Sequence, residues 1–141
     1  MTDSQANRGT PIPISEIPLG AMAERMGITI LEASVERVVC QMPVAGNTQP
    51  FGLLNGGASM ALAETLGSIG ANLFAGPDRM AVGIDINGTH HRSATEGLVT
   101  GVATPLSLGR TLVVYEIVIS DERDKRLCTA RITCLLRDIK K

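Results

Sequence analysis

The longest regular pattern in the chain is a run of small and apolar residues over residues 57–74. Apolar positions fall on every side of a helix built from this run, and a helix that is apolar all round is normally buried. Asn55 has a side chain of the type that caps helix N-termini, and Ala-Gly-Pro-Asp at 75–78 stops the helix. The pattern therefore predicts a buried helix of about 27 Å at 1.5 Å per residue.

Strand-like patterns lie on both sides of this helix. Residues 28–44 are rich in Val and Ile and predict a bent strand or a hairpin, interrupted near Ser34 or Glu36. Beyond the helix the alternation has a period of two, and it predicts strands over residues 82–91, 98–106, 111–120 and 126–137. The turns at 107–109 and 121–125 are short, so these strands are expected to pair antiparallel.

Two of these strands have well-marked faces. In the first, the expected buried face consists of Val82, Ile84, Ile86 and His90, and the expected polar face of Asp85, Asn87, Thr89 and His91. In the last, one apolar face carries Cys128, Ala130, Ile132, Cys134 and Leu136. Both patterns predict a sheet with one side packed against the helix.

This order of elements predicts an α+β domain in which an antiparallel sheet packs on one long helix. A single helix cannot cover both faces of such a sheet, so the other face is either solvated or used for association. A short helix is expected over residues 19–26, ended by Gly27. Residues 1–15 are expected to form a flexible tail, and residues 16–141 a single domain.

Composition narrows the class of protein. A chain of 141 residues with 44% hydrophobic residues can bury one core. The formal net charge of -1 leaves no basic excess for a nucleic-acid backbone, and no segment has the pattern of a secretory signal or a membrane-spanning helix. We therefore expect a cytoplasmic protein with no nucleic-acid or membrane partner.

The cysteine and histidine positions argue against disulfides and metal sites. The three cysteines are an odd number without zinc-like spacing, and they are expected to be buried, reduced thiols. His90 and His91 are adjacent, so on a strand they point to opposite faces and cannot readily share one metal ion. No metal site is predicted.

The predicted helix carries one carboxylate, Glu64, two turns from its start. This group can be structural, hydrogen-bonded to backbone, or it can act as a nucleophile or general base. The pair Gly56-Gly57 precedes it. That pair can form a tight turn, or it can let a ligand approach the N–H groups at the positive end of the helix dipole.

These residues belong to a segment that resembles the signature of hotdog-fold acyl-CoA thioesterases: Gln49-Pro-Phe-Gly-Leu-Leu-Asn-Gly-Gly-Ala-Ser-Met-Ala-Leu-Ala-Glu-Thr-Leu-Gly-Ser68. The segment is most similar to the branch with hydroxybenzoyl-CoA, phenylacetyl-type and dihydroxynaphthoyl-CoA thioesterases. The resemblance continues through residues 87–94 and 105–109, and covers about residues 20–137.

The resemblance implies a hotdog fold whose active sites lie between paired subunits, in a dimer or a dimer of dimers. Glu64 matches the family's catalytic carboxylate, as nucleophile or general base. The N–H of Gly56 would polarise the thioester carbonyl, and Gln49 would position the carbonyl or water. Ser68, one helical turn beyond Glu64, would lie near the carboxylate and can hold water.

The resemblance also implies a channel for coenzyme A, which is part of the substrate, so no separate cofactor is expected. The residues implied in CoA binding are His90, His91, Arg92, Ser93, Ser107 and Arg110. A guanidinium such as that of Arg92 suits phosphate recognition.

Asn55 departs from the family pattern, which has histidine here in a His-Gly-Gly sequence. Asparagine does not titrate, but its side-chain nitrogen donates hydrogen bonds and its side-chain oxygen accepts them. It can replace a histidine that positions the loop, whereas activity would fall if the histidine transfers a proton. The departure fits natural variation, an engineered substitution, or a binding protein that has lost its chemistry.

The sequence thus predicts hydrolysis of an acyl-CoA with an aromatic or medium-chain acyl group, a dihydroxynaphthoyl type included. The alternative is a non-catalytic or impaired acyl-CoA-binding protein on the same fold, because of Asn55. A hotdog-type hydratase is less favoured, since the sequence offers no second acid/base pair for it.

Overall fold

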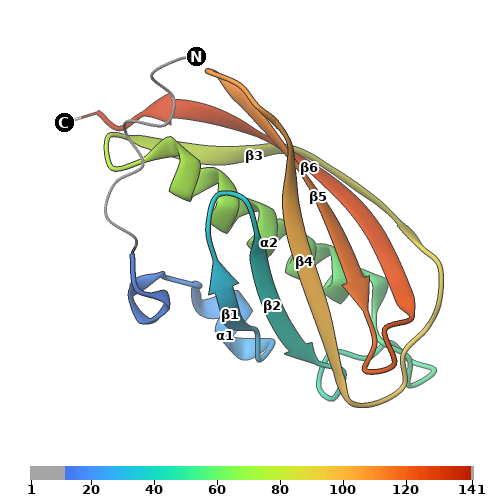
Figure 1. Ribbon diagram of the computed structural model, residues 1–141. Coiled ribbons are helices and arrows are strands. Elements are labelled where there is room, and N and C mark those ends of the chain that lie inside the picture. Colours follow the sequence, from blue (N-terminus) through green and yellow to red (C-terminus); the bar gives the residue numbers. More distant parts are fainter. Residues whose placement is uncertain (1–11, 141) are drawn as a thin grey trace.

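The computed structural model describes residues 12–140, in which a curved antiparallel sheet wraps around one long helix (Figure 1). The strand order across the sheet is β1-β2-β4-β5-β6-β3. In chain order the elements are η1 (Ile14–Glu16), α1 (Ala21–Arg25), β1 (Thr29–Ala33), β2 (Val38–Pro43), α2 (Gly56–Ala75), β3 (Arg79–His90), β4 (Leu98–Leu108), β5 (Leu112–Ser120) and β6 (Arg126–Asp138). The predicted α+β architecture is confirmed.

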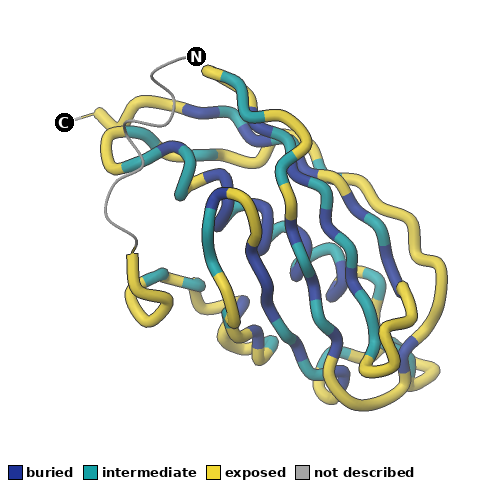
Figure 2. Tube along the Cα trace, in the orientation of Figure 1, coloured by how far each residue is buried: buried dark blue, intermediate teal, exposed yellow. Residues whose placement is uncertain are grey.

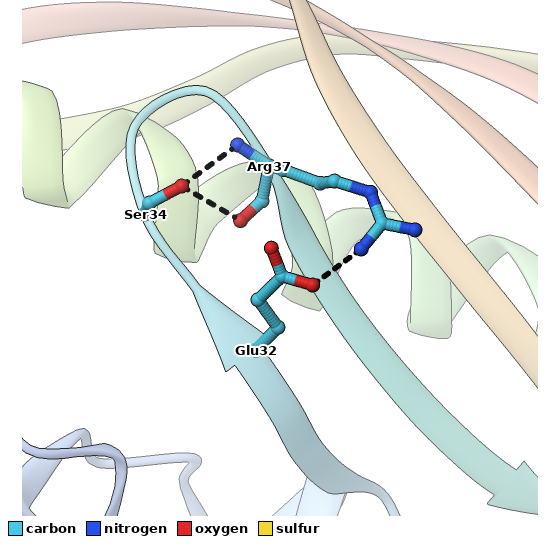
Figure 3. A network of polar contacts seen from close by, with 3 residues as sticks. All are labelled: Glu32, Ser34 and Arg37. Carbon is cyan, nitrogen blue, oxygen red and sulfur yellow. Dashed lines mark hydrogen bonds and ion pairs between the residues drawn. The ribbon is translucent and has the colours of Figure 1, made fainter.

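Residues 28–44, predicted to be a bent strand or a hairpin, form a hairpin, and its turn lies where the interruption was expected. Ser34 closes the turn: its hydroxyl donates to the Arg37 carbonyl at 3.1 Å and accepts from the Arg37 N–H at 3.0 Å (Figure 3). The Arg37 guanidinium also pairs with the carboxylate of Glu32 in β1. Both of these side chains are about half exposed, so the ion pair contributes little, and the turn depends mainly on Ser34.

The core lies between α2 and the inner face of the sheet, where the buried residues concentrate (Figure 2). Leu62 and Leu66 of α2 are fully buried there. The predicted apolar face of β6 is confirmed, since its residues from Cys128 to Leu136 are at most 8% exposed at every second position. The helix is apolar all round because strands contact several of its sides.

The buried face predicted for β3 is wrong for the first half of the strand. Ile86 lies opposite the buried Ile132 of β6, on the helix side, as predicted. A bulge between Gly83 and Asp85 breaks the alternation, so that Ile84 is the extra residue and is 56% exposed. An extra residue shifts the side-chain phase by one position.

On the N-terminal side of this bulge, the two faces of β3 are exchanged relative to the prediction. Val82 pairs with Leu135 on the outer face, and Gly83 pairs with Cys134 on the helix side. On the C-terminal side the expected polar set of β3 remains on the outer face. Because β3 is an edge strand in the single chain, Val82 and Ile84 leave apolar surface along an unpaired edge.

The turn between β4 and β5 was predicted too early in the chain, whereas the turn between β5 and β6 was predicted correctly. Ser107 is not in a turn but in β4, opposite Val114, after a bulge that follows Pro105. The tip between β5 and β6 does lie at residues 121–125, where the Asp121 carboxylate accepts from the N–H groups of Arg123 and Lys125 at 2.8 and 2.9 Å. The hydrogen bond from Lys125 is the largest cause that lowers the pKa of Asp121.

The N-terminal region is described only in part. The short helix predicted over 19–26 is α1, and Gly27 follows it with a φ of 76°. Most of the tail predicted over 1–15 lies outside the described residues, and Ile14 already belongs to η1. Within residues 12–140, none of the helices has the length and hydropathy needed to cross a membrane.

Tyr115, the one tyrosine of the chain, joins three parts of the fold. It is fully buried on β5, and its hydroxyl donates to the Val35 carbonyl in the β1–β2 turn at 2.6 Å. Its ring occupies the space beside Gly70 of α2, where a Cβ would lie 2.6 Å from the ring.

We expect Tyr115→Phe to lower the free energy of unfolding by about 1–2 kcal/mol, because the buried Val35 carbonyl loses its donor while the packing of the ring is kept. Urea unfolding followed by circular dichroism measures this. A change below about 0.3 kcal/mol, with an unchanged m value, would show that the bond contributes nothing net.

Candidate active site

Glu64 lies half-buried on α2 and faces the bulge in β3. A Cβ built on Gly83 would lie 2.6 Å from Glu64 Oε1. The carboxylate therefore occupies the space that any side chain at position 83 would need. Gly83 was not among the predicted site residues, although a glycine inside a strand pattern is itself a signal of a bulge or a close approach.

Two further residues of α2 meet β3 in the same way. Gly56, Met60 and Glu64 are four residues apart, so they lie along one face of the helix. A Cβ on Gly56 would lie 2.9 Å from His90 Nε2, and a Cβ on Gly88 would lie 2.9 Å from the sulfur of Met60. These contacts align α2 with β3, so the bulge fixes where the carboxylate sits.

Cys134 is the thiol nearest in register to this carboxylate, since it pairs with Gly83. Burial and, to a smaller extent, the negative charge of Glu64 raise the pKa of the Cys134 thiol to about 11. Burial also raises the pKa of Cys40 to about 12 and that of Cys128. All three cysteines are buried and free, as predicted, and a thiol with so high a pKa is a poor nucleophile near neutral pH.

At the N-terminus of α2, one first-turn N–H group is left without a hydrogen-bond acceptor in the described part of the chain. Asn55 caps the helix as predicted: its Oδ1 accepts from Gly57 N at 2.7 Å, and its carbonyl accepts from Ala58 N and Ser59 N. Among the described residues, the Gly56 N–H has no acceptor. It is thus the first-turn donor left for a ligand, at the positive end of the helix dipole.

Gln49 lies in the loop before α2, and its side-chain oxygen is engaged within that loop. The oxygen accepts from Phe51 N at 2.5 Å and from Leu53 N at 3.4 Å. The group that Gln49 can offer a ligand is therefore its Nε2 amide, a donor.

Ser68 and Glu64 line a common pocket. This pocket has a volume of about 360 Å³ and lies between α2 and residues 12–19. Ser68 is one helical turn beyond Glu64 on the same face, as the spacing predicts. Glu64 and Ser68 are therefore brought together, whereas Gly56 and Gln49 lie toward the other end of the helix.

The two histidines point to opposite faces of the sheet, as predicted. His90 lies on the inner side against Gly56, but it is exposed, whereas the sequence pattern predicted it to be buried. His91 Nε2 lies 2.9 Å from Thr129 Oγ1, in a shallow hollow of the outer face. Arg92 and Ser93 follow in an exposed connection, where the charge of Arg92 also helps to lower the pKa of Asp121.

Ser107 and Arg110 are not brought near the 90–93 segment within one chain. His90 pairs with Cys128 of β6, whereas Leu112, next to the turn that holds Arg110, pairs with Leu135. Seven residues of β6 separate these positions, which is about 23 Å at 3.3 Å per residue. The Arg110 carbonyl instead accepts from the Arg79 guanidinium at 3.0 Å.

The described residues contain no group of three His, Cys, Asp or Glu side chains that could hold a metal ion. The groups that this part of the chain offers to a ligand are the Glu64 carboxylate, the Gly56 N–H and the Gln49 amide. A helix N–H can stabilise a developing oxyanion, and a carboxylate can attack a carbonyl or activate water.

Comparisons with known proteins give matches both to a family model and to named relatives. The family model described as "Thioesterase superfamily" matches residues 51–128. A relative named proofreading thioesterase EntH, from Cronobacter sakazakii, is 46% identical over 116 residues, which cover 82% of this chain and 85% of the relative.

Solved structures show the same fold. A Haemophilus influenzae thioesterase has a TM-score of 0.83 and 38% identity, over 86% of this chain and 85% of that chain. A mutant Pseudomonas aeruginosa thioesterase has a TM-score of 0.82 and 36% identity, over 84% of this chain and 87% of that chain. The arrangement of sheet and helix is the hotdog fold that the sequence predicted.

Proposed function

We propose, from the premise that this chain belongs to the thioesterase superfamily and is a thioester hydrolase, that it cleaves acyl-CoA thioesters through Glu64. The observation that carries the proposal is that one helix presents both this half-buried carboxylate and the unbonded N–H of Gly56, which two copies of the chain could bring to one thioester. The N–H stabilises the oxyanion, and the carboxylate supplies the attack.

The reaction can follow either of two balanced routes. As a nucleophile, Glu64 attacks the carbonyl carbon, the C–S bond breaks, CoA leaves as its thiolate, and water then hydrolyses the mixed anhydride. As a general base, Glu64 takes a proton from water, whose oxygen attacks the same carbon. The C–S bond then breaks, the acid is released, and CoA leaves as a thiolate that takes up the proton. In both routes the Gln49 amide donates to the carbonyl or water, and the Ser68 hydroxyl holds the water.

Two copies of the chain are needed to complete such a site. Gly56 and Glu64 are eight residues apart on one helix, about 12 Å along its axis, which is too far for both backbone donor and carboxylate to meet one carbonyl directly. The unpaired edge of β3, with exposed Val82 and Ile84, lies beside Glu64 and offers the joining surface. We therefore propose a homodimer, alone or as a dimer of dimers.

Light scattering at micromolar concentration tests this assembly, and a monomer would contradict it.

Coenzyme A would meet His91, Arg92 and Ser93 from one chain and Ser107 and Arg110 from another, since one chain holds these groups far apart. His90, which lies against Gly56, would contact the thioester end of the substrate. No cofactor beyond the CoA of the substrate is needed, and the expected cytoplasmic location stays a prediction.

The acyl group is proposed to be aromatic or medium-chain. An assay of CoA release over aromatic and aliphatic acyl-CoAs tests the function directly. We expect the chain as it stands to release CoA from at least one of these substrates, and absence of turnover over the whole series would contradict the proposal.

The alternative function, acyl-CoA binding without hydrolysis, rests on Asn55. Its side-chain oxygen already accepts a hydrogen bond from the Gly57 N–H as the cap of α2, and its amide cannot act as an acid or a base. Measuring Asn55→His beside the unmodified chain separates the two functions. Strong turnover only in the variant would favour the binding function.

Gly83→Ala is expected to lower kcat by about 10–100-fold, because the new Cβ would displace the Glu64 carboxylate and small misplacements of reacting groups are costly. The matched control is Gly88→Ala on the same strand, whose Cβ would meet the Met60 sulfur at 2.9 Å, and Ala130 Cβ and the Thr129 carbonyl at 3.2 Å, but not the carboxylate. Steady-state kinetics on both variants measures the difference. Equal kcat values in the two variants would show that Gly83 does not position Glu64.

A further inference from the structure

The segment between β2 and α2 is anchored by one side chain, that of Asn47. Asn47 ends a tight turn, in which its N–H donates to the Val44 carbonyl at 2.9 Å and Gly46 has a φ of 84°. A positive φ at the third position of a turn favours glycine. The turn returns the chain toward the end of β2, where the Asn47 side chain finds its partners.

The Asn47 side chain joins α1 to β2. Its Nδ2 donates to the carbonyl of Met26, at the C-terminus of α1, and to the carbonyl of Pro43, the last residue of β2, both at 2.8 Å. Because both partners are carbonyl oxygens, the group that faces them is the donor nitrogen. A Cβ on Gly27 would lie 2.8 Å from the Pro43 ring, so the missing side chain at residue 27 lets the two elements come close enough to share one amide.

The Asn47 backbone continues this anchor to the N-cap of α2. Its carbonyl accepts from the Asn55 N–H at 2.9 Å. The other hydrogen bonds of Asn55 within residues 12–140 stay in the first turn of α2, where its Oδ1 accepts from Gly57 N and its carbonyl accepts from Ala58 N and Ser59 N. The bond to Asn47 is therefore the one that ties the cap residue itself to the rest of the described domain.

The direction of the Gly56 N–H follows from the position of this cap. The Asn55 carbonyl and the Gly56 N–H belong to one trans peptide unit, in which the two groups point in opposite directions. Because the carbonyl points into α2, the N–H points out of its N-terminus. The preceding N–H, that of Leu54, donates to the Ala94 carbonyl at 2.8 Å. Two adjacent N–H groups thus hold the cap, and loss of the Asn47 anchor leaves it held by one.

We propose, on the basis of the proposed function, that Asn47 is a positioning residue that holds the Gly56 N–H where the oxyanion of the thioester develops. It acts through Asn55 and does not contact the substrate. An oxyanion donor has to lie within about 2.7–3.1 Å of the oxyanion, so a small shift of the cap weakens binding of the transition state more than binding of the substrate. Loss of the Asn47 amide therefore lowers kcat and leaves KM nearly unchanged.

The first test measures kcat and KM of Asn47→Ala with benzoyl-CoA and decanoyl-CoA. We expect kcat to fall about tenfold, since small misplacements of reacting groups are costly, and KM to stay within about twofold. The matched control is Ser34→Ala, which also removes a side chain that bonds backbone groups in a turn, but outside the candidate pocket. It should leave kcat within about twofold. A kcat of Asn47→Ala that matches this control would overturn the proposal.

Two variants of Gly56 separate positioning from a loss of folded protein. Proline is tolerated at the first position of a helix and has no N–H. Gly56→Pro therefore removes the donor, whereas Gly56→Ala keeps it, and both place a Cβ against the His90 ring. Turnover of Gly56→Pro is read at a hundredfold higher enzyme concentration, since loss of one oxyanion donor costs about 10²–10³-fold in kcat.

We expect Asn47→Ala to lower kcat about tenfold in the Gly56→Ala background and less than twofold in the Gly56→Pro background, where no donor is left to misplace. A smaller folded fraction would lower kcat by the same factor in both backgrounds. Equal factors would therefore show that Asn47 supports folding alone, and would overturn the proposal.

Amide hydrogen exchange, followed by NMR, tests the anchor without catalysis. In Asn47→Ala the Asn55 N–H should exchange at least tenfold faster. The Ala81 N–H, which donates to the Asn72 side chain near the other end of α2, should change less than twofold. Unchanged exchange at Asn55 would overturn the proposal. No hydrolysis of either acyl-CoA by the unmodified protein would instead contradict the proposed function, and the positioning role with it, whatever the exchange rates.

Discussion

Glu64→Gln is expected to lower kcat by about 10²–10⁴-fold or more, because the amide can neither attack the thioester carbonyl nor take a proton from water. The substitution keeps the size of the side chain, so the contact with Gly83 is retained. Release of CoA from the best substrate, under saturating conditions, measures the change. KM should move much less than kcat, since the carboxylate acts on the reacting atoms.

The matched control is Glu96→Gln, the same change at an exposed carboxylate outside the pocket. It should leave kcat within twofold. A Glu64→Gln variant that is folded by circular dichroism and keeps more than about half of the activity would exclude both catalytic roles of Glu64.

A single turnover in ¹⁸O-labelled water detects the nucleophilic route in which water attacks the Glu64 side of the mixed anhydride. If Glu64 is the nucleophile and water attacks the Glu64 side of the mixed anhydride, the first acid released carries an unlabelled carboxylate oxygen from the enzyme, and Glu64 takes up the label. If Glu64 is a general base, the acid is labelled from the first turnover and Glu64 stays unlabelled. Mass spectrometry of product and peptide reads both outcomes.

Local patterns were sufficient for most of the fold. The small, apolar run predicted α2 to within one residue at each end, and Asn55 was correctly predicted as its N-cap. These features depend on neighbours in sequence, through helix periodicity and side-chain capping. The inner face of β6 was predictable for the same reason, because a regular strand keeps its alternation.

The first half of β3 was not predictable from alternation, because one extra residue at Ile84 reverses the faces before it. The same bulge turns Gly83 toward α2 and makes room for the carboxylate of Glu64. The residue types of the site were therefore found from the signature, whereas its geometry depends on a long-range register between β3 and β6. The pocket under residues 12–19 likewise depends on contacts between segments that are distant in sequence.

Leu66→Ala is expected to lower the free energy of unfolding by about 2–5 kcal/mol, the range for a fully buried leucine that leaves a cavity. Leu66 is fully buried between α2 and the sheet. Its Cδ1 lies over Gly101 of β4, where a Cβ would come within 2.3 Å of it. Urea unfolding measures the loss, and Met22→Ala, at a 63% exposed position, should change stability by less than about 0.5 kcal/mol.

A double-mutant cycle with Gly101→Ala tests the packing itself. Gly101→Ala alone should cost about 1–3 kcal/mol, because its Cβ overpacks against Leu66. In the Leu66→Ala background the same Cβ enters the space that the leucine has left, so the combined loss should be smaller than the sum of the two single losses by at least about 1 kcal/mol. Additive losses would mean that Leu66 and Gly101 do not share this contact, and that the helix sits farther from β4 than the close approach at Gly101 requires.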